Sequence, residues 1–419
     1  MRTFELRPLT SEQRVADAEQ LTWATHGDAP GLIDANDGPW LAHLGSQSAS
    51  AIDLVRVAVG AYIADRLARR PRSFTRTIGL HVQMLHPEPW RPLLDPLADL
   101  LHWVSGDFWQ VEVSSEQPSQ PAPNADPQDS MEVVALLSGG LDSFCGAILA
   151  DPRAQRLLLS HADNTIVKGA QNRANAWLAA HRPPPFPAYR VTVTQRGPKR
   201  EPSSRSRSFL FLSLAVAAAD AVGATRVEVP ENGFTSLNPP LASNRGGALS
   251  TRSTHPTTIH RFNGLLEGLG IVARIGDPFS DLTKGEFLAR AAAVAGDAFP
   301  QGAAETLSCG KLDGARYRGG DANKHCGLCF PCIVRRGAFL GAGVPDRTAY
   351  LIDQLHGDAR EKLLANRADD VAAVQWAVEH GIDDVALLAA GPYPPGFDFD
   401  AALDLCDRGL AELASVPLP

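Results

Sequence analysis

A glycine-containing loop between two apolar segments constrains the fold of this chain more than any other feature. The loop is Ser138-Gly139-Gly140-Leu141-Asp142-Ser143, and the apolar residues before it, 133–137, have the pattern of a buried strand. The apolar residues after it, 144–149, are typical of the first turns of a helix. Because glycine adopts backbone conformations that other residues avoid, the segment predicts a sharp turn from a strand into a helix.

The same loop has the composition of an anion-binding site. Backbone N–H groups at such a turn form a concave nest at the positive end of the following helix, and phosphate oxygens fit this nest. Ser138 and Ser143 add hydroxyl donors, and Asp142 can hold a Mg²⁺ ion or a water molecule on it. An ordinary tight turn explains the glycines but not the two serines and the aspartate. We therefore expect the loop to bind phosphate.

The length and the net charge of the chain limit the number of domains and the classes of partner that we expect. The chain has 419 residues, which is enough for two or three domains with sizeable cores. Its net charge of −8 argues against direct binding to nucleic acid through a sequence-wide electrostatic attraction. We find no signal-peptide pattern, and the most apolar stretch, 209–224, is interrupted by Asp220 and falls short of a membrane span. We expect a cytoplasmic enzyme or binding protein that does not enter the membrane.

Five segments are predicted from composition and periodicity. Residues 1–114 have an α+β pattern without a catalytic constellation, and residues 115–130 are polar and proline-containing, as in a linker. From 131 to 305 strand and helix patterns alternate, which predicts an α/β domain with a doubly wound, mostly parallel sheet. A cysteine-rich zinc module, 306–340, and a C-terminal helical region, 341–419, complete the chain.

The strands and helices of the α/β segment are predicted from their periodicity. The strands are 133–137, 157–160, 189–194, 226–230 and 271–275. The helices are 143–150, 170–181, 208–222, 257–268 and 284–295. Ligands of such sheets bind beyond the carboxyl ends of the strands. The loops in which we expect functional residues are therefore 138–143, 160–168, 195–207, 231–256 and 276–284.

Four of the six cysteines fall between residues 309 and 332, the last three in a Cys-x2-Cys-x2-Cys run. Four thiolates at this spacing suit a tetrahedral structural Zn²⁺, and a disulfide network is not expected without a secretion signal. An iron–sulfur cluster stays open as an alternative, although ferredoxin runs continue with a further cysteine and here Ile333 follows. His325 is expected to be a neighbour of the metal rather than a ligand. The expected ligands are Cys309, Cys326, Cys329 and Cys332.

The Ser-Gly-Gly-x-Asp-Ser pattern resembles the PP-loop of the ATP pyrophosphatase superfamily, whose members split ATP between its α and β phosphates. Neither a Walker phosphate loop nor a Gly-x-Gly-x-x-Gly motif is present. Arg207 before an apolar helix, the segment Thr283-Lys284-Gly285-Glu286 and the cysteines then follow in the order found in the QueC family of 7-cyano-7-deazaguanine synthases. The resemblance covers about residues 131–340 and implies a PP-loop, HUP-like fold.

The resemblance also implies a mechanism. A substrate carboxylate attacks the α-phosphorus of ATP, pyrophosphate leaves toward the loop, and an amine displaces AMP from the acyl-adenylate. ATP, Mg²⁺ and Zn²⁺ are the implied cofactors, and a deazaguanine-like carboxylate is the implied substrate. The implied catalytic residues are Asp142, Arg207 and Lys284. The alternative for Arg207 and Lys284 is that they are solvated charges on surface loops. The implied ATP contacts are Ser138, Gly139, Gly140, Leu141, Asp142 and Ser143.

Other segments depart from the QueC pattern and leave the substrate open. The chain lacks the Tyr-Gly-Gln segment of QueC at 160–164 and its Tyr-Pro-Asp-Cys stretch at 254–258, and Ser208 stands where the family has Asn. Glu231 is the acidic residue that we expect to accept from the N–H edge of a guanine-like base. The alternative is that Glu231 is a surface residue in a turn. The candidate substrate contacts are Glu231, Asn232, Arg252 and His255.

The segments 231–233, 249–252 and 254–256, with the extra N-terminal and C-terminal regions, resemble the QueC-like proteins of anti-phage defence operons, among which QatC is the most similar. This resemblance implies proteins of the same defence operon as partners. Two other functions stay open. A tRNA-modifying PP-loop enzyme would need a nearby thiol, for which only Cys145 is at hand, and a nucleotide-binding subunit of a defence complex would bind ATP without turnover.

Overall fold

The computed structural model describes residues 1–23, 33–35, 44–71, 75–116, 130–197, 200–201, 205–242 and 252–419. Most of the predicted linker 115–130 lies outside these residues, as do parts of the predicted loops 195–207 and 231–256. None of the described helices has both the length and the apolar character needed to cross a bilayer.

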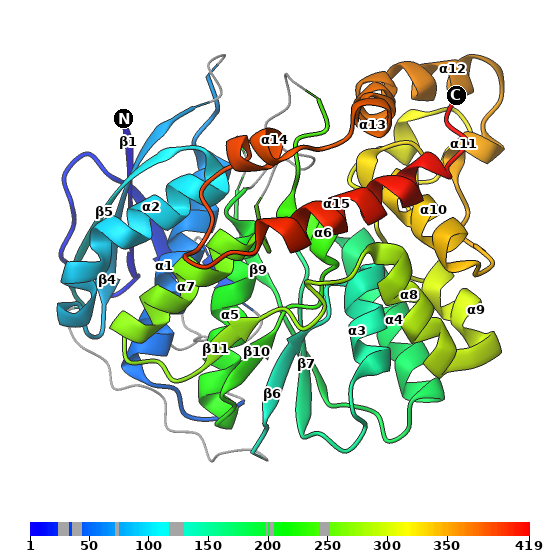
Figure 1. Cartoon of the computed structure of the whole chain (residues 1–419). Helices are drawn as coiled ribbons and strands as arrows, with labels where there is room; N and C mark the ends of the chain where they lie inside the picture. Colours follow the sequence, from blue (N-terminus) through cyan, green and yellow to red (C-terminus); the bar gives the residue numbers. More distant parts are fainter. Residues whose placement is uncertain are drawn as a thin grey trace.

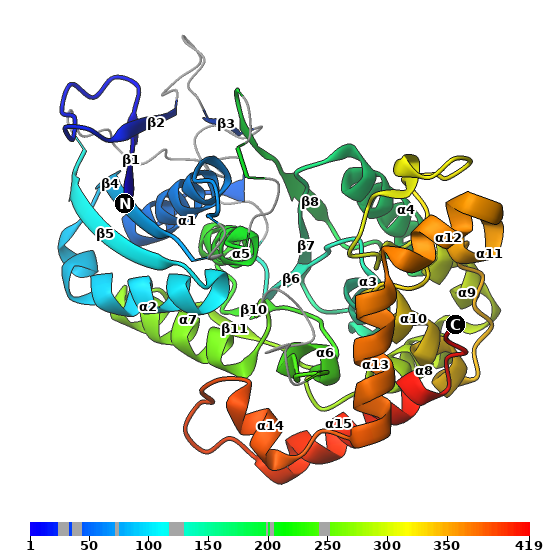
Figure 2. The ribbon, with the colours of Figure 1, turned by 90° about the horizontal axis from the view of Figure 1, so that it is seen from above.

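The described strands form two sheets, which lie side by side in the molecule (Figures 1 and 2). Sheet A has the order β5-β4-β1-β2-β3-β9, and its pairs are parallel except for β3 with β9. Its strands are β1 (Arg2–Pro8), β2 (Glu19–Trp23), β3 (Ile33–Ala35), β4 (Thr77–Met84), β5 (Phe108–Ser115) and β9 (Val193–Gln195).

The N-terminal strands therefore do not have the α+β arrangement expected from the sequence. A helix returns the chain from β4 to the start of β5, so the two strands run in the same direction and pair in parallel. Strands β1 and β2 were also not predicted, although β1 lies at the centre of the sheet with Phe4 and Leu6 fully buried.

Sheet B is parallel and has the order β11-β10-β6-β7-β8. The predicted strand 189–194 is in fact two strands, because its first half pairs with β7 while its second half crosses to sheet A and pairs with β3. The strands of sheet B are β6 (Val133–Leu136), β7 (Arg156–His161), β8 (Ala188–Val191), β10 (Arg226–Glu228) and β11 (Arg274–Gly276).

The strand order of sheet B reverses beside β6. The chain runs from β6 to β7 and β8 on one side, and then crosses to β10 and β11 on the other side. The loops after β6 and β10 therefore leave in opposite directions and open a crevice between them, which is where ligands of doubly wound sheets bind. Residues 138–143 and 229–232 meet at this switch point.

Helices cover both faces of sheet B, and all five predicted helices are present with ends shifted by up to five residues. Side chains alternate along β6, so Val134 and Leu136 join the core on one face while Val133 and Ala135 join the core on the other. The first face is covered by α5 (Arg207–Val222) and α7 (Pro256–Gly268). The second face is covered by α3 (Leu141–Leu149), α4 (Thr165–His181), α8 (Lys284–Ala295) and α9 (Phe299–Ala304).

The core of the N-terminal region is continuous with the core on the first face of sheet B. Helix α1 (Ala49–Leu67) contacts both β4 and α5, and α2 (Leu94–Ser105) contacts both β5 and α7. Figure 2 shows these helices between the two sheets. Every residue of α1 from Ala51 to Leu67 is buried, because the helix packs against elements on both sides.

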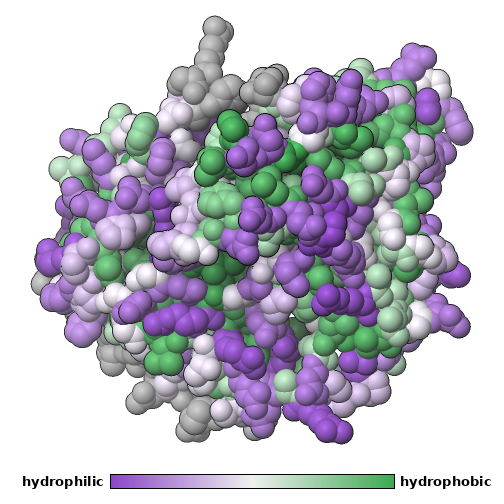
Figure 3. Space-filling model, viewed as in Figure 1, coloured by the Kyte–Doolittle hydropathy of each residue, from purple (hydrophilic) through white to green (hydrophobic). Residues whose placement is uncertain are grey.

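The C-terminal region has a separate core that contains the clustered cysteines. Helix α15 (Phe399–Ala414) runs across the front of the molecule in Figure 1 and contacts α10, α13 and α6. Helix α14 exposes Val385 and Leu388, and apolar side chains gather on the surface there (Figure 3). The remaining helices are α6 (Gly233–Leu237), α10 (Phe330–Ala342), α11 (Leu351–Gln354), α12 (Gly357–Ala365), α13 (Ala368–His380), α14 (Asp384–Ala389) and the 3-10 helices η2 (Glu88–Leu93), η3 (Gly296–Ala298) and η4 (Gly314–Arg316).

Candidate active site

The loop after β6 has the geometry of an anion nest. Gly139 has a positive φ of 85°, and a Cβ atom there would come within 3.0 Å of the Gln171 side chain, so only glycine fits. Gly140 is the N-cap of α3, and no side chain caps this helix end. The Ser138 hydroxyl accepts from the Gly140 N–H at 3.2 Å and lies 3.0 Å from the Ser143 hydroxyl. The hydroxyls and the amino end of α3 therefore face one place, where an anion is favoured.

A cavity of about 240 Å³ lies at this helix end, and its wall includes Ser138, Asp142 and Lys284. The Lys284 ammonium pairs with the Asp142 carboxylate, and both side chains are buried. Burial alone lowers the pKa of Lys284, but the carboxylates of Asp142 and Glu231 outweigh it and raise the pKa above its usual value. Lys284 therefore keeps its positive charge beside the nest.

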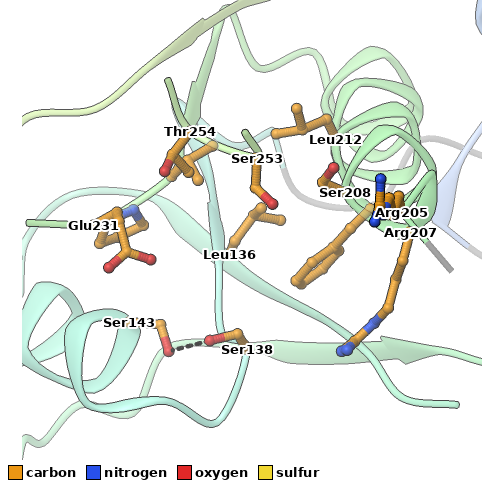
Figure 4. Close-up of a pocket in the computed structure, with 13 residues that line it drawn as sticks. Leu136, Ser138, Ser143, Arg205, Arg207, Ser208, Leu212, Glu231, Ser253 and Thr254 are labelled. Atoms are coloured by element: carbon orange, nitrogen blue, oxygen red, sulfur yellow. Dashed lines mark hydrogen bonds between the residues drawn. The ribbon is translucent and has the colours of Figure 1, made fainter. Parts of the chain in front are cut away.

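Arg207 lies in a neighbouring cavity of about 250 Å³ rather than in the Lys284 cavity. Arg205 and Arg207 extend from the start of α5, on the side of the cavity opposite Ser143 and Glu231 (Figure 4). Both cavities share Ser138. The two expected cations thus flank the loop from opposite sides. The apolar wall of the Arg207 cavity consists of Leu136, Phe211, Leu212, Val229 and Pro230.

Asn232 links two carboxylates at the boundary between the cavities. Its side-chain N–H donates to Asp142 Oδ1 at 3.2 Å and to Glu231 Oε1 at 3.1 Å, while its own oxygen caps α6. Burial and the nearby Asp142 charge raise the pKa of Glu231 well above its usual value. The structure therefore brings Glu231 and Asn232, expected to contact substrate, next to the expected phosphate residues.

Asp277 belongs to the same group of carboxylates but was not singled out from the sequence. Its Oδ1 accepts from the Phe279 N–H at 3.0 Å, while its Oδ2 is buried without a hydrogen-bond partner. Burial raises the pKa of Asp277 to about 7, and the Asp142 charge contributes. The available signal was position, because Asp277 follows a predicted strand and lies in the candidate loop 276–284.

A third cavity, of about 620 Å³, adjoins the site between α7 and α15. It shares Thr254 with the Arg207 cavity, and its wall includes Arg408, which bonds to Asp404 at 2.8 Å and pairs with Glu286. The C-terminal helical region thus forms part of the site. The carboxylates in the wall of this cavity belong to Asp277, Asp281, Asp398 and Asp404.

The His255 side chain lies behind the cavity wall. Its Nδ1 accepts from the Thr257 N–H at 3.1 Å, and its ring packs at centroid distances of 5.1 Å from Trp103 and 5.0 Å from Tyr393. Burial lowers the pKa of His255 to about 3, and the Arg252 charge contributes, so the ring is neutral. Its contact with substrate stays a prediction.

The Arg252 side chain is also held by the surrounding protein. Its guanidinium lies 4.1 Å from the centre of the Trp103 ring and donates to the carbonyl oxygens of Trp103 at 3.3 Å and Ala390 at 3.4 Å. The two residues that follow it, Ser253 and Thr254, line the Arg207 cavity. Arg252 and His255 therefore anchor the ends of the segment that forms this part of the wall, and a role for Arg252 in binding substrate stays a prediction.

Four cysteines meet in the C-terminal core. Their Sγ atoms all lie within 4.8 Å of one another, with separations of 3.9 Å for Cys309–Cys329 and Cys326–Cys332. A tetrahedral zinc site with Zn–S bonds near 2.3 Å requires S–S separations of roughly 3.8 Å, so the group can hold a zinc ion. His325 lies beside the group, and its Nε2 accepts from the Ser308 N–H at 2.9 Å.

Cys145 does not have the surroundings of a reactive thiol. Its side chain is buried on α3 behind the loop, and burial together with the Asp142 charge raises its pKa far above the usual value. A nucleophilic cysteine needs a lowered pKa and access to substrate.

No family model matches the chain. The 7-cyano-7-deazaguanine synthase of Cupriavidus taiwanensis is 30% identical over 148 residues, which are 35% of this chain and 56% of that protein. Proteins of Methanothrix thermoacetophila (28%, same name) and Sphingopyxis alaskensis (27%, 7-cyano-7-deazaguanine synthase 1) match over 52% of this chain and 97% of their own length. The chain thus spans little more than half the length of the first relative. At about 30% identity over part of the chain, these relatives support a QueC-like family.

Proposed function

We propose that this protein uses ATP to activate the carboxylate of a deazaguanine-like substrate, and that an amine then displaces AMP. In the first step a carboxylate oxygen bonds to the α-phosphorus while the bond to the bridging oxygen breaks and pyrophosphate leaves. In the second step the nitrogen of the neutral amine bonds to the acyl carbon, AMP leaves with the bonding electrons, and the nitrogen loses a proton to solvent, so that an amide forms. The observation that carries the proposal is the Asp142–Lys284 pair beside the uncapped amino end of α3.

The loop and the two cations beside it are suited to the negative charge of the leaving pyrophosphate. The N–H groups of the nest and the hydroxyls of Ser138 and Ser143 would bind the leaving pyrophosphate, while Lys284 and Arg207 would spread its charge from opposite sides. A Mg²⁺ ion, when bound, would take Asp142 as an oxygen ligand and neutralise phosphate charge. Zinc on the four cysteines would have a structural role, because four protein ligands fill a tetrahedral site and leave no open position for water or substrate.

The Arg207 cavity supports a flat heterocycle as the substrate. Leu136 and Phe211 offer apolar surface to a ring, and Glu231 lies at the edge of the same cavity with Ser253 and Thr254. A carboxyl group at that place would pair with the N–H edge of a guanine-like base.

The acid-lined cavity supports an amine as the acceptor. Asp277, Asp281 and Asp398 would attract an amine in its cationic form, which has to lose a proton before it attacks, and Thr254 connects this cavity with the Arg207 cavity. We further propose that the reaction serves an anti-phage defence system, as the resemblance to QatC-like proteins implies, and the product is then either a conjugate to an amine or a nitrile. The departures from the QueC pattern at 160–164 and 254–258 support this finer assignment.

Product analysis tests the function. The protein is incubated with ATP, Mg²⁺ and 7-carboxy-7-deazaguanine, with ammonium or a primary amine, and AMP, pyrophosphate and product masses are measured. We expect AMP only with the acid, and a loss of at least about 100-fold in Asp142→Ala, because the variant loses a carboxylate beside the phosphates. Asp151→Ala, at an exposed loop position, is the control. Stabilisation by ATP without AMP formation from any acid would contradict the proposal.

A further inference from the structure

One carboxylate of the N-terminal region holds the backbone that carries Arg207. Asp65 lies on α1 and is fully buried. Its Oδ2 accepts three hydrogen bonds from a segment 140 residues further along the chain: from the Arg205 N–H at 2.8 Å, the Ser206 N–H at 3.0 Å and the Ser206 hydroxyl at 2.9 Å. Arg205 and Arg207 line the cavity beside Ser138.

Asp65 binds the backbone immediately before α5, at the N-cap residue Ser206 and at Arg205. Ser206 is the N-cap residue of this helix, but its hydroxyl does not bond to the helix backbone and donates to Asp65 instead. Backbone N–H groups at a helix start need acceptors, and a negative charge there stabilises the helix dipole. A residue of α1 therefore fixes where α5 begins, and with it the Arg207 backbone.

The Asp65 side chain is itself held in place. Its Oδ1 pairs with Arg76, and Arg70 lies 3.5 Å from the same oxygen. Both arginines also contact Asp107, so the carboxylate is fixed by a buried network of charges from α1, β4 and β5 ends. Breaking one member of such a network changes the positions of its neighbours.

The next residue of α1 makes a second attachment to the same edge of sheet B. The Arg66 guanidinium lies 3.7 Å from Asp163 in the loop after β7, and the Arg66 carbonyl accepts from the N–H groups of Arg200 and Glu201. The C-terminal end of α1 thus contacts both the segment before α5 and the loop after β7.

We infer that Asp65 is a positioning residue for the ATP site, through which the N-terminal region sets Arg205 and Arg207 against the phosphate loop. This inference rests on the proposed function, because it concerns the cation that would bind the leaving pyrophosphate. It assigns a part in the chemistry to a region that has no counterpart in the PP-loop motifs of the sequence.

A double-mutant cycle between Asp65→Asn and Arg207→Ala tests the inference. Asn has one acceptor oxygen and one NH2 group, so either the donors of residues 205 and 206 or the arginines on Oδ1 lose their acceptor, and the carboxylate charge is lost with little change in side-chain volume. We expect Asp65→Asn to lower kcat/KM for AMP formation about 10-fold to 100-fold, because small displacements of catalytic groups have effects of this size. In the Arg207→Ala background the same change should lower it less than about threefold, since the two residues act as a unit.

Asp53→Asn is the matched control. Asp53 lies on the same helix, is equally buried, and accepts from the backbone N–H groups of Leu85 and His86 at 2.9 and 2.8 Å. It is remote from the cavities, so we expect this variant to lose stability while kcat/KM stays within about twofold of the parent. Its effect should be the same with and without Arg207.

Two further measurements keep the test decisive. Ser206→Ala removes one of the three bonds and leaves the Asp65 ion pairs intact, and it replaces Asp65→Asn in the cycle if that variant does not fold. The affinity for ATP with Mg²⁺ is measured for every variant by calorimetry. If the parent forms no AMP, the proposed function fails, but non-additive losses of ATP affinity would still support the inference. Additive losses, or parent-like behaviour of Asp65→Asn, would overturn it.

Discussion

The regions before and after the ATP-loop sheet reach the site by similar contacts but are attached to the sheet in different ways. Asp65 of the N-terminal region accepts from backbone N–H groups next to Arg207, and Glu412 of the C-terminal region accepts from the Gly285 N–H next to Lys284. The N-terminal region shares one continuous core with sheet B, whereas the C-terminal region has its own core around four cysteines.

This difference has consequences for how each region unfolds. Opening the N-terminal region would expose the apolar faces of α1 and α5 together, so its stability is tied to that of sheet B. We expect the C-terminal core to open while the helices of sheet B keep both of its faces covered, although α10 contributes Ala338 and Phe339 to the core on the second face. We therefore expect the same kind of substitution to destabilise a larger part of the protein in the N-terminal region than in the C-terminal region.

The largest effect is expected from the cysteines. Cys329→Ser removes one of four metal ligands, and structural zinc contributes about 10 kcal/mol or more to the folding of small modules. Metal analysis should show loss of zinc, and hydrogen exchange should accelerate across residues 306–419 but not in sheet A. Cys406→Ser is the control, because this buried cysteine of the same core lies outside the cluster. If the parent protein contains iron, the metal of this site is iron and not zinc. An equal loss of hydrogen-exchange protection in both regions would contradict the proposed difference between them.

A pair of identical core substitutions comes next. Leu54→Ala in α1 and Leu363→Ala in α12 each remove a fully buried leucine side chain, which costs about 2–5 kcal/mol. We expect native-state hydrogen exchange to show the loss across both sheets for Leu54→Ala, but only within the C-terminal core for Leu363→Ala. If Leu54→Ala leaves sheet B fully protected, the N-terminal region is a separate unit.

The sequence predicted sheet B well because its strands and helices have strong local patterns. It did not predict β1 and β2, although both are longer than β6, β10 or β11, because periodicity does not encode how the strands of sheet A pair with one another. Periodicity also does not predict that the N-terminal region and sheet B share one continuous core. A helix such as α1, buried on all sides, has no polar face to indicate how many layers cover it.

For the site, residues within the motifs were easier to predict than the residues that support them. Loop 138–143, Lys284 and the cysteines carry spacing that points to phosphate or metal chemistry. Asp65, Asp277 and Glu412 have no such spacing, because each acts across a tertiary contact between segments far apart in the sequence. Position after a predicted strand singled out only the loop of Asp277.

A smaller effect is expected from Asp277, which lies in the cavity that α15 closes. Its pKa is raised to about 7, mainly by burial, so between about pH 4 and pH 7 the folded protein holds a proton that the unfolded chain has released. The free energy of unfolding then falls as the pH rises through this range. Relative to the parent, Asp277→Asn should gain about 2 kcal/mol between pH 5 and pH 8, because its amide does not ionise.

Denaturant unfolding at the two pH values, without Mg²⁺, measures this gain. Asp281→Asn, at an exposed position of the same loop, should gain less than about 0.5 kcal/mol. The comparison of the regions becomes sharper in the Cys329→Ser background, where an open C-terminal region would let water reach Asp277 and the pH dependence should disappear. A gain that is unchanged in that background would mean that sheet B alone buries Asp277.

The smallest effect is expected from Glu412→Gln. Both carboxylate oxygens of Glu412 lie 3.0 Å from the Gly285 nitrogen, and the Thr283 hydroxyl donates to the same group. The fit is close, because a Cβ atom at Gly285 would come within 2.5 Å of Glu412 Oε1. Glutamine keeps the shape but turns N–H donors toward these donors, so we expect kcat for AMP formation to fall about tenfold as Lys284 shifts from Asp142.

The effect on kcat distinguishes a role of Glu412 in positioning Lys284 from a role in only closing the cavity. If Glu412 acts through Lys284, Glu412→Gln should have little further effect in a Lys284→Ala background, as expected for Asp65 with Arg207. Glu361→Gln, at an exposed position of α12, should leave kcat unchanged. A Glu412→Gln variant that loses stability like Leu363→Ala but keeps the parent kcat would break the parallel. The N-terminal region would then act on the chemistry, while the C-terminal region would only close the cavity around it.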